Sequence, residues 1–188
     1  MAPTFVKNIA DVVNAQQGDK LPVSAFKDIA DGTIPAGTAA YEKRGVAVMV
    51  PEWDETKCIQ CNSCSYVCPH AAIRPFLMTE EEAAAAPASI KKQQGKAVLK
   101  DYKFAISVSV ADCTGCGNCV DVCLAKDKAL TMVPYQPADQ KVFDWLHSHI
   151  GYKENILNKA GNVKNAQFAQ PLFEFSGACA GCGETPYI

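Results

Sequence analysis

The sequence predicts an α+β domain with internal pseudo-twofold symmetry, flanked by extended arms. Three observations predict this class. A run of four cysteines occurs twice at a constant offset of 55 residues, an alternating apolar stretch indicates a strand, and two stretches carry helix signals. A chain of 188 residues is long enough for one or two small domains. Its composition is ordinary apart from ten cysteines.

Composition and charge exclude several classes of protein. The net charge is −2 and there is no long basic stripe, so we expect no nucleic-acid partner. No apolar run is long enough to span a bilayer, and the N-terminus carries no secretory signal. We therefore expect no membrane partner and a cytoplasmic location, where clustered cysteines are typically metal ligands rather than disulfides.

The first 50 residues contain no cysteine and are expected to form an N-terminal arm. Glycines and prolines, as in "DGTIPAGTAAYEKRG", predict an extended, loop-rich segment that continues from a preceding domain. The following apolar run "GVAVMVP" (45–51) is closed by Pro51, which predicts a short strand before the first cysteine motif.

The elements after the first cysteine motif follow from local patterns. Thr79 and Glu82 form a capping-box pattern, which predicts a helix that Pro87 ends. Residues 102–110 alternate between apolar and other side chains, which predicts a strand with one buried face. After the second motif, apolar residues at every fourth position in 138–150 predict an amphipathic helix, and residues 151–175 are polar enough for a linker.

The two cysteine motifs are "KCIQCNSCSYVCPHAAIRP" and "DCTGCGNCVDVCLAKDKAL". Three cysteines at C-x2-C-x2-C spacing wrap around one cubane cluster, and the fourth cysteine of such a run ligates the other cluster in two-cluster ferredoxins. The sequence therefore predicts a ferredoxin-like domain with two [4Fe–4S] clusters and crosswise ligation. The first cluster would be held by Cys58, Cys61, Cys64 and Cys123, and the second by Cys113, Cys116, Cys119 and Cys68.

Residues between the cysteines fit this chemistry. Asn62, Gly115, Gly117 and Asn118 tolerate tight or left-handed backbone, which lets turns direct N–H groups at the sulfurs. The alternatives are a structural zinc module, although zinc sites usually separate two CxxC pairs by a longer loop, and clusters that are structural and inert. Five lysines could form a docking patch for an acidic redox partner, or a solvated loop: Lys91, Lys92, Lys96, Lys100 and Lys103.

The two motifs, followed by "FSGACAGCGETPY" and preceded by "GTAAYEKRGVAVMVPEW", resemble the iron–sulfur region of pyruvate:ferredoxin (flavodoxin) oxidoreductases. The resemblance implies a homodimeric enzyme that uses thiamine diphosphate, Mg²⁺ and coenzyme A to convert pyruvate to acetyl-CoA and carbon dioxide. Electrons would pass from a third cluster beside thiamine diphosphate, through the two clusters, to external ferredoxin or flavodoxin. Cys179 and Cys182 would be two ligands of that third cluster, and Glu184 would touch thiamine diphosphate.

The resemblance also implies that this chain is a fragment and is not catalytic by itself. The remaining ligands of the third cluster and the pyruvate site lie further along in family members. The expected parts are an arm from the preceding domain (1–50), the two-cluster domain (51–135) with an insertion (76–100), a helix and linker (136–170), and the start of the thiamine-diphosphate domain (171–188). The insertion would pack against the rest of the enzyme or a redox partner.

Two other functions compete with this interpretation. One is a free-standing ferredoxin that diffuses as an electron carrier. The other is an electron-transfer subunit of an oxidoreductase that acts on another 2-oxoacid, because nothing in these motifs identifies the substrate.

Overall fold

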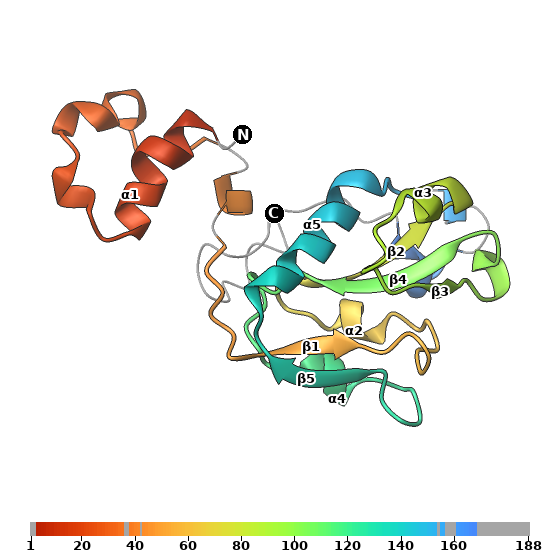
Figure 1. The fold of residues 1–188 in the computed structure, drawn as a ribbon. Helices are drawn as coiled ribbons and strands as arrows, with labels where there is room; N and C mark the ends of the chain where they lie inside the picture. Colours follow the sequence, from red (N-terminus) through yellow and green to blue (C-terminus); the bar gives the residue numbers. More distant parts are fainter. Residues whose placement is uncertain (1–2, 36–37, 42, 154, 157–160, 169–188) are drawn as a thin grey trace. The chain divides into compact units, whose positions relative to one another are not determined.

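A computed structural model of the chain describes residues 3–35, 38–41, 43–153, 155–156 and 161–168 (Figure 1). The chain divides into two compact units, one up to Lys43 and one from Arg44 onward. The second unit contains all the cysteines of the two motifs.

The first unit is helical, so the expected extended conformation is wrong here. A π-helical segment continues directly into α1, and three 3-10 segments follow. Their bounds are Val6–Ala10, α1 Asp11–Asn14, Gly18–Lys20, Val23–Ile29 and Thr38–Tyr41. The missed signal is the recurrence of Phe5, Ile9 and Val13 at every fourth position. These side chains line one pocket together with Phe26 and Ile29.

The second unit is built from two antiparallel sheets. In the two-stranded sheet, β1 (Met49–Trp53) pairs with β5 (Leu130–Pro134). The three-stranded sheet has the order β2–β4–β3, with β2 (Ile73–Met78), β4 (Lys103–Val108) and β3 (Gln93–Gln94). The two halves of this unit therefore share both sheets. The half with the first motif supplies β1 and β2, and the half with the second motif supplies their partners β5 and β4.

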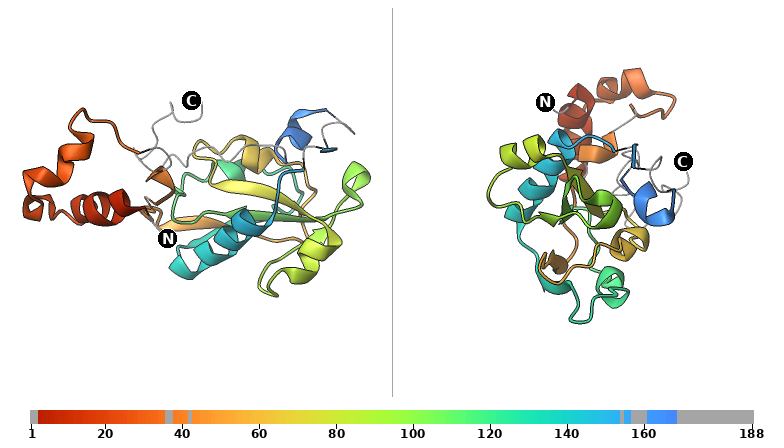
Figure 2. Two further views of the ribbon diagram at one scale, coloured as in Figure 1. Left: turned by 90° about the horizontal axis from the view of Figure 1, so that it is seen from above. Right: turned by 90° about the vertical axis from the view of Figure 1, so that its right-hand side faces the viewer.

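Two one-turn helices carry the third cysteine of each motif. They are α2 (Ser63–Tyr66) and α4 (Asn118–Asp121), again 55 residues apart, and they pack against each other. Both lie on the side of the strands away from α5 (Figure 1 and Figure 2). The pseudo-twofold relation between the cysteine motifs is thus also a relation between their local structures.

The core of this unit forms around Phe104 of β4, which is fully buried. Its ring contacts Trp53 of β1 and Phe168 edge-on, with centroids 6.1 and 6.2 Å apart. Helix α5 (Gln140–His149) packs along β4 and buries Phe143 and Leu146. The amphipathic helix predicted at 138–150 is therefore confirmed.

The capped helix is confirmed in its details. Helix α3 (Glu80–Ala85) begins after Thr79, whose hydroxyl oxygen accepts a hydrogen bond from the Glu82 N–H at 3.2 Å. The Glu82 carboxylate accepts one in return from the Thr79 N–H at 2.7 Å. This helix belongs to the segment predicted as an insertion (76–100). That segment joins the three-stranded sheet through β3, and its Leu99 is buried.

Three sequence expectations need correction. The strand expected at 45–51 is instead β1, which runs through Pro51; proline is tolerated because both strands of a two-stranded sheet are edges. Strand β4 is buried on both faces rather than one, and both α5 and β1 contact it. The polar stretch expected to be a linker contains α7 (Val163–Ala166) and buries Ile156 and Phe168.

Within the described residues, none of the helices has the length and apolar character needed to cross a bilayer.

Candidate iron–sulfur sites

The first cavity between the two sheets is lined by four cysteines of crosswise origin. Cys58, Cys61 and Cys64 come from the first motif, and Cys123 comes from the second. The rest of the wall includes Trp53 of β1, together with other apolar side chains. The cavity has a volume of about 20 Å³.

The second cavity repeats this arrangement with the motifs exchanged. Cys113, Cys116 and Cys119 come from the second motif, and Cys68 comes from the first. Its volume is also about 20 Å³, so the two cavities are of similar size. These two groups are hereafter the first set (Cys58, Cys61, Cys64, Cys123) and the second set (Cys68, Cys113, Cys116, Cys119). The structure brings together the same groups that the sequence analysis assigned to each cluster.

The loop of each motif aims a backbone N–H at its first cysteine. Gln60 N–H donates to Cys58 Sγ at 3.4 Å, and Gly115 N–H donates to Cys113 Sγ at 3.3 Å. Both donors have left-handed backbone, with φ of 60° for Gln60 and 71° for Gly115. Such N–H···S bonds stabilise a negatively charged sulfur.

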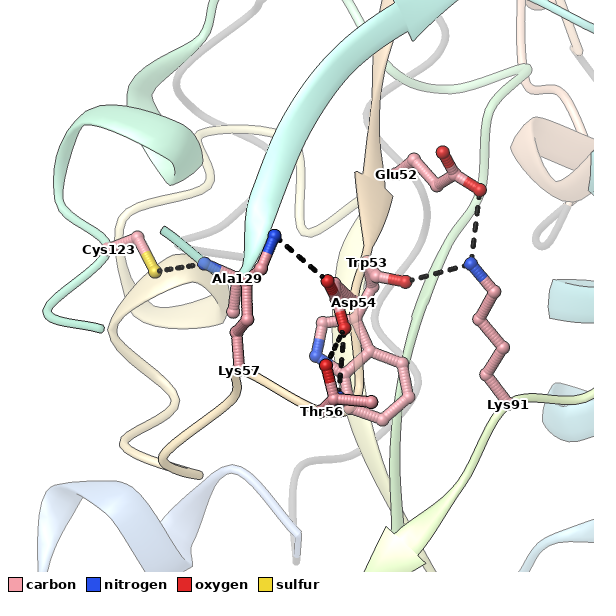
Figure 3. A network of polar contacts seen from close by, with 8 residues as sticks. All are labelled: Glu52, Trp53, Asp54, Thr56, Lys57, Lys91, Cys123 and Ala129. Atoms are coloured by element: carbon pink, nitrogen blue, oxygen red, sulfur yellow. Dashed lines mark hydrogen bonds and ion pairs between the residues drawn. The ribbon is translucent and has the colours of Figure 1, made fainter. Parts of the chain in front are cut away.

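The fourth cysteine of each motif also accepts a backbone hydrogen bond. Ala72 N–H donates to Cys68 Sγ and Ala129 N–H donates to Cys123 Sγ, both at 3.3 Å; Figure 3 shows the second of these. In each case the residue immediately before the donor, Ala71 or Lys128, has a positive φ. Each set therefore contains two sulfurs that accept backbone N–H groups.

The left-handed positions were only partly predicted. Asn62, Gly115 and Gly117 have positive φ as expected, whereas Asn118 is the first residue of α4 and is helical. Gln60 was missed because glutamine has no general preference for left-handed backbone. Its conformation depends on tertiary hydrogen bonds that a local pattern does not reveal.

Burial makes several of these thiols hard to ionise on their own. Burial, reinforced by the neighbouring cysteines, raises the pKa of Cys64 to about 12. The same causes raise the pKa of Cys119 to about 12, and burial raises the pKa of Cys113. Thiolates at these positions therefore need a cation to balance their charge. Four sulfurs around each cavity fit an iron–sulfur cluster, whose iron supplies that charge.

Most of the lysines expected as a docking patch contact acceptors within the domain. Lys91 Nζ bonds the Glu52 carboxylate at 3.1 Å and the Trp53 carbonyl at 3.2 Å (Figure 3). Lys92 Nζ bonds the Ala83 carbonyl and Lys103 Nζ bonds the Gln94 side chain. Lys96 is exceptional because it reaches the carbonyl of a cysteine of the first set.

Three residues predicted from the resemblance lie outside the described residues. They are Cys179, Cys182 and Glu184. Their assigned roles remain predictions.

Comparison with known proteins identifies the class of this domain. Residues 51–124 match the family model of the 4Fe-4S dicluster domain, and residues 1–47 match the EKR domain, a domain of unknown function. All eight cysteines of the two sets lie within residues 51–124, so this part of the second unit belongs to the class of 4Fe-4S dicluster domains.

Longer proteins extend the identification to a family. The chain is 52% identical over 186 residues to a pyruvate-flavodoxin oxidoreductase of Enterobacter agglomerans and 50% identical over 191 residues to a pyruvate:ferredoxin oxidoreductase of Moorella thermoacetica. It is 49% identical over 191 residues to a pyruvate dehydrogenase [NADP(+)] of Cryptosporidium parvum. These alignments cover 98%, 99% and 98% of this chain, but only 16%, 16% and 10% of the relatives. The chain belongs to the pyruvate:ferredoxin (flavodoxin) oxidoreductase family. It corresponds to the part of these longer proteins that the alignments cover.

Proposed function

We propose that the chain supplies the electron-relay portion of a pyruvate:ferredoxin oxidoreductase. The complete enzyme would convert pyruvate and coenzyme A to acetyl-CoA and carbon dioxide, and would reduce ferredoxin or flavodoxin. The observation that carries the proposal is the crosswise grouping of cysteines, in which each cavity takes three cysteines from one motif and one from the other.

In this proposal the first set and the second set each ligate one [4Fe–4S] cluster. Such a cluster supplies one-electron redox chemistry when it is bound. The protein's own part is to hold four thiolates in place, donate N–H groups to their sulfurs and limit contact with water. Trp53, Ile106 and Leu130 provide apolar walls for the first cavity, and Ile73, Val108 and Met132 do so for the second.

Both sets have neighbours at the surface, which a relay requires. Ile59, between two cysteines of the first set, is 47% exposed. Leu124, which follows Cys123 of the first set, is 67% exposed, and Cys116 of the second set is itself exposed. An inert structural centre has no need for such access, so this exposure supports exchange of electrons with groups outside the domain.

The remaining features of the enzyme are proposed from the family relationship. They are thiamine diphosphate with Mg²⁺, a third [4Fe–4S] cluster that includes Cys179 and Cys182, contact of Glu184 with thiamine diphosphate, a homodimer and a cytoplasmic location. The names of the relatives mention flavodoxin, ferredoxin or NADP(+). Because this chain is about half identical to each of those proteins, we infer that it relays electrons within the enzyme and does not by itself select the acceptor.

Anaerobic reconstitution tests the proposed clusters. The chain should bind about eight iron and eight sulfide, and the reduced form should give an EPR spectrum of two interacting clusters. Replacing Cys61 with serine should alter one cluster, whereas the control variant Ser63→Ala should leave both in place. Binding of zinc without sulfide would contradict the proposal.

A second measurement separates a relay domain from a free-standing ferredoxin. The native cluster-containing protein should be far larger than the 20.2 kDa of this chain and should oxidise pyruvate when coenzyme A is supplied. A native cluster protein of about that size would favour a diffusible carrier instead.

A further inference from the structure

Two lysine ammonium groups lie against the main chain of the first set. Lys96 Nζ donates to the Cys58 carbonyl at 3.3 Å. Lys128 Nζ donates to the Cys123 carbonyl at 3.0 Å. The two lysines come from different halves of the pseudo-twofold domain, yet both contact cysteines of the same set.

The main chain of Lys96 is fixed by a buried side chain. Gln60, which is fully buried, accepts a hydrogen bond from the Lys96 N–H at 2.9 Å and donates one to the Gln94 carbonyl at 2.8 Å. The Gln93 side chain adds a contact to the Cys58 carbonyl at 3.4 Å. The segment 93–96 therefore lies directly on the loop that carries the first set.

Lys128 is held by more than one contact. Its ammonium also donates to the Asp121 carbonyl at 2.8 Å, near the end of α4. Lys128 precedes Ala129, whose N–H donates to Cys123 Sγ. The charge of Lys128 is thus placed by the same turn that directs a hydrogen bond at a sulfur of the first set.

The second set has a different electrostatic environment. Arg74 and Asp112 are both buried and interact with its cysteines, Arg74 with Cys68 and Asp112 with Cys113. They also interact with each other. Because their charges have opposite signs, their effects on a cluster held by this set partly cancel.

We propose that Lys96 and Lys128 make the cluster held by the first set the more easily reduced of the two. The proposal rests on the ligand sets proposed above. Reduction adds one negative charge to a cluster, and a nearby positive charge stabilises that reduced form. An electron shared between the two clusters therefore resides mainly at the first set. Both lysines act through space, as residues that set the potential and do not bind the iron.

Redox titration of the anaerobically reconstituted chain, followed by EPR, tests this role. The component that changes in Cys61→Ser identifies the cluster of the first set. Lys96→Gln removes the ammonium but keeps the N–H that bonds Gln60, and Lys128→Gln removes the second charge. At a fixed potential, each variant should lower the reduced-to-oxidised ratio of that component about threefold, as expected for a charge near the surface. The two substitutions together should lower it further.

Three comparisons make the test specific. The control Lys100→Gln removes an exposed lysine four residues after Lys96 and should shift neither component. Lys96→Arg keeps the charge and should preserve the ratio. The component of the second set should change less than that of the first in every lysine variant.

Unchanged ratios in Lys96→Gln and Lys128→Gln, with full iron and sulfide content, would overturn this role of the lysines. An equal shift of both components would overturn it as well, because the charges would then not distinguish the sets. Failure of the proposed function would look different: the unmodified chain would not reach eight iron and eight sulfide.

Discussion

Gln60 occupies a backbone conformation that most side chains avoid, at the residue that donates to the Cys58 sulfur. Its φ is 60°, and the corresponding residue of the second motif is Gly115. Glycine reaches this conformation without strain. Glutamine reaches it because its buried amide bonds Gln94 and Lys96. Tertiary hydrogen bonds at one loop thus replace the conformational freedom that glycine gives to the other.

Substitutions of Gln60 should separate the strain from the hydrogen bonds. Gln60→Gly removes the two amide bonds but relieves the strain, whereas Gln60→Ala removes the bonds and keeps the strain. Left-handed backbone costs a non-glycine residue about 1–2 kcal/mol. Alanine should therefore release iron to a chelator about fivefold faster than glycine, and glycine faster than the unmodified chain. Equal rates for the two variants would contradict this account of the loop.

Gly115 and Gly117 form a matched pair for a second prediction. Both have positive φ, but a Cβ on Gly115 would lie 2.8 Å from the Met49 carbonyl oxygen, whereas a Cβ on Gly117 would meet nothing within 4 Å. Gly115→Ala should therefore lose much of the cluster of the second set, because backbone must move to admit the methyl group. Gly117→Ala should cost only the backbone strain of about 1–2 kcal/mol. The iron and sulfide content after reconstitution compares them, and equal losses would show that the Met49 contact is unimportant.

At the scale of elements, the cap of α3 offers a direct test of local stability. Thr79→Ala removes the hydroxyl that accepts from Glu82 N–H and should cost about 1 kcal/mol. The reconstituted protein should melt a few degrees lower. Glu81→Ala, at an exposed position of the same helix, is the control and should change the melting temperature less. An equal effect of both substitutions would show that the cap contributes little.

Local patterns predicted some elements and missed others for physical reasons. The capping box and the spacing of Val142, Leu146 and Ile150 depend on neighbouring residues alone, and α3 and α5 were predicted from them. Strand β2 was missed because it contains Pro75, which an edge strand tolerates only in its tertiary setting. The helical first unit was missed because its glycines and prolines obscured a short apolar face.

The candidate sites were more predictable than the sheets around them. Cluster geometry limits cysteine spacing strongly, so the spacing of the two motifs is sufficient to predict the membership of both sets. What the spacing could not provide was the environment of each set. The contacts of Gln60, Lys96 and Lys128 join residues that are distant in sequence or depend on an unusual turn.

At the scale of the whole second unit, strands and cysteines are exchanged between the two halves. Strand β1 pairs with β5, β2 pairs with β4, and each cavity draws cysteines from both motifs. Neither half can therefore complete a sheet or a cysteine set alone. Assembly of the clusters and folding of this unit should be coupled, as in other small metal-binding domains.

This coupling predicts that damage at one set weakens the other. Removing Cys68 should first disable the cluster of the second set, and the remaining cluster should then release iron faster, because the two halves are less firmly joined. Cys68→Ser, reconstituted anaerobically, should lose its remaining iron to a chelator at least several-fold faster than the unmodified chain. A remaining cluster that is as durable as before would show that the two sites are independent. Ser63→Ala serves as the control outside the sulfur sets.

The central claim is crosswise ligation, and the most direct test compares three single cysteine variants by EPR-monitored redox titration. Cys61→Ser and Cys123→Ser should perturb the same spectral component, although these cysteines lie in different motifs, and Cys68→Ser should perturb the other. If Cys68→Ser instead changed the same component as Cys61→Ser, and Cys123→Ser changed the other, each motif would hold its own cluster and crosswise ligation would be wrong.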